Sequence, residues 1–173
     1  MFFIVCVRDI WYIGQKEGGK NFFRTCIEVF EDEPVTVVLS VGNFEIAKLG
    51  RIPENSIVRN HVPQISVLKQ ARVFITYGGM NSVSEAMVHS MPMVVIPFVS
   101  DQPVNARQVE KMGLGKVLDY KTITANALRD AAFAVMEDRQ IQENLRKIQK
   151  EISCSPGNAG AAKIIEESFK NNT

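Results

Sequence analysis

Short apolar runs alternate with stretches of helical periodicity along most of the chain. The apolar runs predict strands, which cover residues 35–41, 56–60, 73–76, 93–97 and 116–118. Apolar positions at helical spacing predict helices, which cover residues 21–31, 65–70, 81–90, 103–112, 125–137, 141–152 and 159–169. This alternation is typical of a parallel sheet with helices on both faces. The pattern therefore predicts an α/β fold.

The two ends of the chain are less regular than its centre. Residues 1–20 are predicted to form an irregular N-terminal stretch, in which either Phe2–Val7 or Trp11–Ile13 is the first strand. Residues 21–153 are predicted to form the main domain, and residues 154–173 a C-terminal helix.

The C-terminal helix is separated from the main domain by Ser155, Pro156 and Gly157, whose residue types stop a helix. The spacing of three and four residues between Ala162, Ile165 and Phe169 predicts an apolar stripe along this last helix. We expect the stripe to dock on another surface, either of this chain or of a further domain.

The composition is that of an ordinary globular protein. Of 173 residues, 46% are hydrophobic and 23% are charged, and the net charge is +1. Basic residues are scattered among acidic ones, so we expect no binding to nucleic acid and no stable association with membranes. The three cysteines lie far apart and suit a reducing compartment. The N-terminal apolar run is too short for a signal or membrane segment, and we therefore expect a cytoplasmic protein.

The strongest local signal is a strand that runs into two glycines and then into a helix, in the segment VFITYGGMNSVSE. Gly78 and Gly79 allow a ligand to approach the main chain closely. Asn81 and Ser82 can cap the helix, whose free N–H groups favour a phosphate. Glu85 lies one turn further along the same face, where its carboxylate can bind ribose hydroxyls. In the alternative interpretation, the glycines form only a tight turn with an ordinary helix cap.

A second motif, PFVSDQPVN, also follows a strand and opens a helix. Asp101 is a strong hydrogen-bond acceptor, and Gln102 beside it can both donate and accept. This combination suits the neighbouring hydroxyls of a sugar. Alternatively, Asp101 is only a helix cap, with Pro103 in the first turn.

A third motif, His61-Val62-Pro63-Gln64, follows a strand as well. The flat imidazole ring of His61 can stack on a nucleobase, although a single histidine beside a proline is often just a loop residue. Ligands bind at the carboxyl ends of the strands in open α/β sheets, where all three motifs are expected to lie. Together they match a base, a diphosphate and a sugar.

Residues 61–115 resemble the donor-binding signature of the family 1 UDP-glycosyltransferases, and they are most like its bacterial macrolide-type branch. The resemblance implies a GT-B enzyme, in which two Rossmann-like three-layer α/β/α domains face a cleft. This chain would be the C-terminal, donor-binding domain.

The resemblance also implies a role for each motif residue. His61 would pack on uracil, with Val62 and Gln64 in the same binding loop, and Glu85 would hold the ribose. Asp101 and Gln102 would hold the transferred sugar. The diphosphate turn would comprise Tyr77, Gly78, Gly79, Asn81 and Ser82. Tyr77 departs from the family pattern, which usually has a histidine there.

The implied reaction is transfer of a hexose from a UDP-sugar, with UDP-glucose as the expected donor, to a hydroxyl of a small acceptor such as a macrolide or a phenolic. It proceeds with inversion and needs neither a cofactor nor a metal. No catalytic residue can be assigned in this chain, because the family's base lies in the acceptor domain, so the isolated chain is expected to be inactive. Two alternatives stay open, namely a subunit that needs a separate acceptor-domain chain and a non-catalytic truncated remnant.

Overall fold

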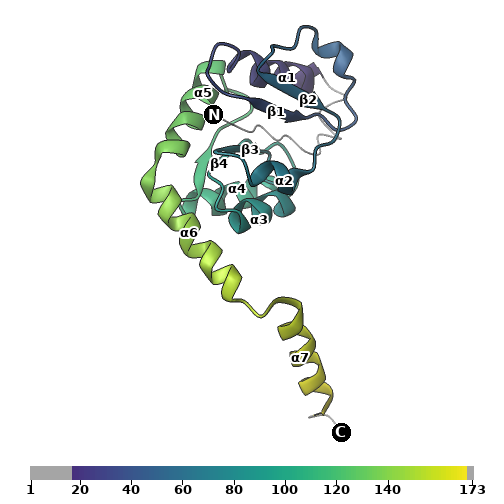
Figure 1. Cartoon of the computed structure of the whole chain (residues 1–173), viewed down its shortest axis with the longest axis vertical. Coiled ribbons are helices and arrows are strands. Elements are labelled where there is room, and N and C mark those ends of the chain that lie inside the picture. Colours follow the sequence, from purple (N-terminus) through teal and green to yellow (C-terminus); the bar gives the residue numbers. More distant parts are fainter. Residues whose placement is uncertain (1–16, 171–173) are drawn as a thin grey trace.

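In the described part of the computed structural model, each pair of hydrogen-bonded strands is parallel (Figure 1). The structure describes residues 17–170, so both candidates for the first strand, Phe2–Val7 and Trp11–Ile13, lie outside the described residues. The strands are β1 (Val37–Ser40), β2 (Ser56–Arg59), β3 (Phe74–Thr76), β4 (Met93–Val95) and β5 (Gly115–Val117). Within the described part, β1 pairs with β2, and β3, β4 and β5 pair in that order.

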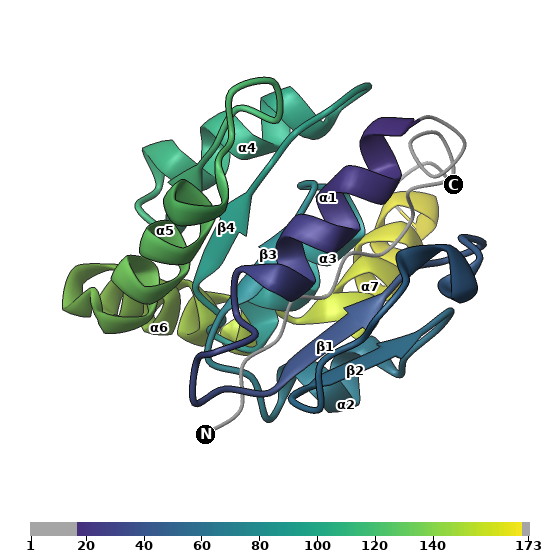
Figure 2. The ribbon, with the colours of Figure 1, turned by 90° about the horizontal axis from the view of Figure 1, so that it is seen from above.

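The described range contains seven α-helices and one short 3-10 helix (Figure 2). They are α1 (Glu17–Glu28), η1 (Ile46–Leu49), α2 (Gln64–Leu68), α3 (Met80–Val88), α4 (Gln102–Lys111), α5 (Ala125–Glu137), α6 (Arg139–Cys154) and α7 (Gly157–Lys170). Helix α5 packs against β4, β5 and α1, while α3 packs against α4 and α6. The predicted α/β fold is confirmed. Helix α1 begins at Glu17, ahead of the predicted domain boundary, and η1 was not predicted.

Strands β3 and β4, which lead into two loops of the candidate site, are fully buried. All side chains of β3 and β4 are buried, as are the large side chains of Phe23 and Leu39. Burial on both faces is typical of parallel strands covered by helices. The loops that follow β3 and β4 therefore start from fixed positions.

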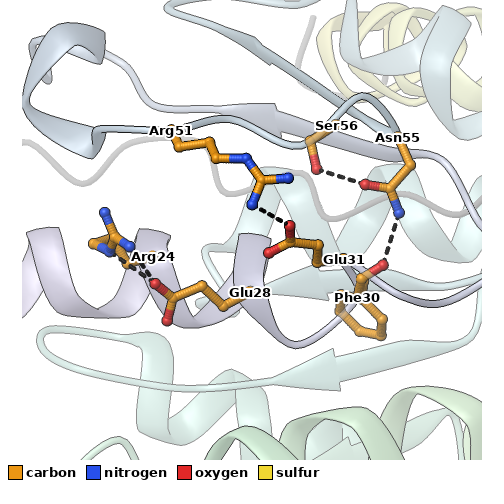
Figure 3. Close-up of polar contacts among 7 residues, drawn as sticks. All are labelled: Arg24, Glu28, Phe30, Glu31, Arg51, Asn55 and Ser56. Carbon is orange, nitrogen blue, oxygen red and sulfur yellow. Dashed lines mark hydrogen bonds and ion pairs between the residues drawn. The ribbon is translucent and has the colours of Figure 1, made fainter.

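Polar contacts hold the end of α1 against the segment that leads into β2 (Figure 3). The guanidinium of Arg51 forms an ion pair with Glu31, with Nη1 and Oε1 2.8 Å apart. The amide of Asn55 donates from Nδ2 to the carbonyl oxygen of Phe30 at 2.7 Å. The second contact satisfies a main-chain carbonyl group just beyond the end of α1, where a helix leaves such groups unpaired.

Helix α7 extends away from the rest of the molecule, at the lower end of Figure 1. Its apolar side chains are exposed, with Ile165 at 56% and Phe169 at 74%. The predicted helix is therefore present, and its apolar stripe faces outward.

No helix within residues 17–170 has both the length and the apolar character that a bilayer crossing requires.

Candidate functional site

Two cavities lie where the loops after β1, β2, β3 and β4 meet helix α3. One, of about 360 Å³, is lined by Ser40, His61, Val62, Pro63, Gln64, Ile65, Ser66 and Glu85. The other, of about 290 Å³, is lined by Thr76, Tyr77, Gly79, Met80, Asn81, Ser82, Asp101 and Gln102. Helix α3 contributes to both, because Ser82 and Glu85 are one turn apart on it.

Ten of the eleven residues predicted to bind a ligand line one of these two cavities. The predicted base and ribose residues share the first cavity, and the predicted diphosphate and sugar residues share the second. Gly78 lines neither, but it lies between Tyr77 and Gly79 in the same turn.

The turn between β3 and α3 depends on Gly78. Its φ of +81° is in the left-handed region, and a Cβ there would lie 2.7 Å from Cγ1 of Val95. Gly79 occupies the N-cap position with extended backbone, and a Cβ there would meet no atom within 4 Å. The space beside Gly79 is therefore open toward the cavity.

The prediction that Asn81 or Ser82 caps α3 is wrong. The helix begins at Met80, so both residues lie inside its first turn, and Gly79 at the N-cap offers no side chain. The first-turn N–H groups are thus left without a side-chain cap. Such groups, together with the positive end of the helix dipole, favour a phosphate.

Asp101 occupies the N-cap position of α4 but makes no capping hydrogen bond. Its Oδ2 instead accepts a hydrogen bond of 2.8 Å from Nδ2 of Asn105, which also donates to the carbonyl oxygen of Gly78 at 2.8 Å. Buried Asn105 thereby joins the predicted diphosphate turn to the predicted sugar-binding carboxylate. Asn105 was not predicted as a site residue, although its spacing of four from Asp101 places both on one helix face.

The side chain of Gln102 stabilises its own loop. Its Oε1 accepts from the main-chain N–H groups of Phe98 at 2.8 Å and Val99 at 3.1 Å. With its oxygen engaged in this way, the amide NH₂ is the part of Gln102 that is free to donate to a ligand in the cavity.

Gln64 and Glu85 are joined across the first cavity. Nε2 of buried Gln64 donates to Oε2 of Glu85 at 2.5 Å. This bond orients the carboxylate and leaves its other oxygen to accept from a ligand. Buried Ser40, at the end of β1, lines the same cavity and donates to the carbonyl oxygen of Asn60 at 3.2 Å. The sequence offered no signal for Ser40, because it ends an ordinary apolar strand.

Tyr77 is 4% exposed and packs among aromatic side chains. Its ring centroid lies 4.7 Å from that of Phe98 and 5.6 Å from that of Phe22. Its hydroxyl is buried and has no hydrogen-bond partner among the described residues. Burial, and to a smaller extent the nearby Cys26 thiol, holds the pKa of Tyr77 well above its usual value. The hydroxyl therefore stays protonated.

We expect Tyr77→Phe to stabilise the nucleotide-free chain and to weaken its binding of UDP. A buried hydroxyl without a partner is destabilising, so its removal should raise the free energy of unfolding by about 1 kcal/mol. If a diphosphate oxygen is the missing acceptor, UDP affinity should fall about tenfold. Urea unfolding and calorimetric titration measure the two effects. An unchanged affinity would place the hydroxyl away from the diphosphate.

Comparison with known proteins identifies the family. The family model described as UDP-glucoronosyl and UDP-glucosyl transferase matches residues 23–154, which is most of the chain. The chain belongs to this family. It is 42% identical over 155 residues to the UDP-glucosyltransferase YojK of Bacillus subtilis, covering 89% of this chain and 38% of the relative. It is 34% identical over 147 residues to the oleandomycin glycosyltransferase of Streptomyces antibioticus, covering 84% and 34% respectively.

Solved structures agree with this assignment. The calicheamicin glycosyltransferase CalG4 matches with a TM-score of 0.89 and 30% identity, over 99% of this chain and 44% of that one. The glycosyltransferase of kitacinnamycin matches with a TM-score of 0.86 and 35% identity, over 95% and 42%. The predicted family and the GT-B type of Rossmann-like fold are therefore confirmed. The chain spans about two fifths of the length of YojK, and it matches the C-terminal portion of its relatives.

Proposed function

We propose that this member of the family binds the UDP-sugar donor of an inverting, metal-independent glycosyltransferase. The observation that supports this most is the order of groups along α3. Glu85 and the base-binding loop lie at one cavity, and the diphosphate turn with Asp101 lies at the other. A nucleoside diphosphate sugar carries its base, ribose, phosphates and hexose in the same order.

Each part of the donor has a suitable group in this arrangement. The exposed ring of His61 can stack on uracil beside Val62, and Glu85 can accept from ribose hydroxyls. The uncapped first turn of α3 can donate to phosphate oxygens without a metal. Carboxylate and amide groups of Asp101 and Gln102 can bind the hydroxyls of the hexose, for which glucose is the expected case.

The transfer would be a single displacement. The acceptor oxygen attacks the anomeric carbon, and the bond from that carbon to the phosphate oxygen breaks as UDP takes the electron pair. The proton of the acceptor hydroxyl passes to a base. First-turn N–H groups of α3 would stabilise the negative charge that develops on UDP.

The base would come from an acceptor domain, as part of the same protein or as a separate chain. The chain has two histidines, and neither suits this role. His61 lines the proposed nucleobase cavity, and His89 is the C-cap residue at the far end of α3.

Exposed Met80, Val99 and Val104 surround the sugar-binding loops and offer an apolar rim to an acceptor domain.

The names of the relatives indicate small acceptors. Oleandomycin and calicheamicin glycosyltransferases act on the compounds they are named after, so we propose a small hydroxylated acceptor such as a macrolide or a phenolic. We also propose a cytoplasmic location, which the free cysteines Cys26 and Cys154 suit.

Asp101→Asn tests the sugar-binding half of this proposal. The variant keeps an oxygen that can accept from Asn105, but it lacks the negative charge offered to the hexose. Calorimetry should show UDP-glucose binding weakened about tenfold and UDP binding unchanged, because charge-assisted hydrogen bonds contribute about 1.5–3 kcal/mol. Asp130→Asn, on the exposed surface of α5, is the matched control and should change neither affinity. Equal weakening of UDP and UDP-glucose would contradict the assignment of Asp101 to the sugar.

A further inference from the structure

A third cavity, of about 440 Å³, lies at the opposite end of α3 from the nucleotide-binding loops. It is formed where α2, α3 and α6 approach the starts of β3 and β4. The residues that line it include Lys69, Arg72, His89, Ser90 and Arg146. Ligands of open α/β sheets normally bind at the carboxyl ends of strands, so this location is independent of the donor site.

The cavity is lined by basic side chains, and none of its described lining residues is Asp or Glu. Lys69 and His89 hold the C-cap positions of α2 and α3, where the helix dipole favours a positive charge. The helices therefore account for these two. They do not account for Arg72 and Arg146, which come from a loop and from α6.

Arg72 and Arg146 are far apart in sequence, yet both line this cavity. Neither forms an ion pair or a side-chain hydrogen bond with a described residue, whereas Arg24, Arg51 and Arg129 each pair with a carboxylate. Both side chains are exposed, and no carboxylate among the described lining residues of the cavity neutralises them, so they are available to an anion that enters it.

Neutral polar groups complete the lining. The hydroxyl of Ser90 is buried and has no hydrogen-bond partner among the described residues. Gln149 donates from Nε2 to the carbonyl oxygen of Val88 at 2.7 Å, and this bond fixes α6 against the end of α3. The position of Arg146 on α6 is thereby set relative to Ser90.

We propose that this cavity binds the phosphate group of a small phosphorylated molecule, held mainly by Arg72 and Arg146. The planar guanidinium group presents paired N–H donors that match phosphate oxygens, and two such groups can neutralise a phosphate dianion. Ser90 can supply a further donor. The cavity is larger than the 290 Å³ cavity of the diphosphate turn, which leaves room for an organic group beside the phosphate.

Residue-resolved NMR titration of the chain tests this proposal, with glucose 6-phosphate and inorganic phosphate as the probes. Saturable amide shifts are expected at Arg72, Ser90 and Arg146, with UDP present to occupy the diphosphate turn. Tighter binding of the ester would identify a phosphorylated metabolite as the ligand, and equal binding would identify free phosphate. Either result supports a phosphate site.

Substitution of both arginines distinguishes this site from general attraction of anions. The double variant Arg72→Gln/Arg146→Gln should weaken binding at least about tenfold, since charge-assisted hydrogen bonds are lost. Lys147→Gln, an exposed neighbour on α6, should leave the affinity unchanged. An unchanged spectrum elsewhere shows that the variants fold. Shifts confined to residues 79–82, shifts reproduced by sodium chloride at the same ionic strength, or equal loss in the control would overturn the proposal.

Discussion

The purified chain alone should release UDP from UDP-glucose no faster than a buffer blank, whichever hydroxylated acceptor is added. Catalysis needs an acceptor hydroxyl in line with the anomeric carbon and a base within hydrogen-bond reach of its proton. The groups that we assign in the candidate site would bind the donor only, and neither histidine lies at the proposed sugar-binding loops. A coupled assay for UDP measures the rate.

Addition of an acceptor domain from a macrolide-type relative, fused or in trans, is the positive arm of this experiment. Turnover that appears with the added domain and is lost in Asp101→Asn would support donor binding by this chain and a catalytic base in the acceptor domain. Acceptor-dependent release by the chain alone, abolished by the same substitution, would show that the chain holds a base of its own.

Gly78→Ala should strongly destabilise the chain. Its left-handed backbone costs an alanine about 1–2 kcal/mol, and the added methyl group would lie 2.7 Å from Cγ1 of buried Val95. Together with overpacking, the free energy of unfolding should fall by roughly 2–4 kcal/mol. For a chain of this size, the melting temperature should fall by roughly 5–15 °C. Thermal unfolding followed by circular dichroism measures the change.

Gly79→Ala is the matched control at the neighbouring position. The backbone of Gly79 suits alanine, and the added methyl group would meet no protein atom within 4 Å. Stability should therefore change by less than about 1 kcal/mol. UDP affinity should fall about tenfold, because the methyl group projects toward the cavity where we place the diphosphate. Similar stability losses in both variants would contradict the turn geometry described here.

Much of the fold was predictable because local signals and tertiary packing agree. Helix α5 has the predicted bounds, since Thr124 accepts a capping hydrogen bond from Ala127 N at 3.2 Å and the helix ends just before Asp138. The short 3-10 helix η1 was missed because its four residues are too few to show a period. The three motif loops were also predicted to meet, since parallel strands end at one edge.

Features of the site that depend on distant residues could not be predicted. Asn105 binds Gly78, which is 27 positions earlier in the chain. The aromatic packing of Tyr77 involves Phe22, which lies in α1 at the N-terminal end of the described residues. The cap of α3 was assigned two to three residues too far along, because polar side chains after two glycines resemble a capping signal. The N-cap residue is instead Gly79, which has extended backbone and makes no side-chain capping hydrogen bond.

Calorimetric titration of the chain with UDP, ADP and GDP is the most direct test of donor binding. The base-binding loop of His61 and Val62 is proposed to select uracil, while the diphosphate turn would bind all three nucleotides alike. We predict that UDP binds more tightly than ADP and GDP. We also predict that Glu85→Ala lowers the affinity for UDP, because the carboxylate no longer contacts the ribose. Equal affinity for the three nucleotides, or no binding of UDP, would contradict the proposed donor binding.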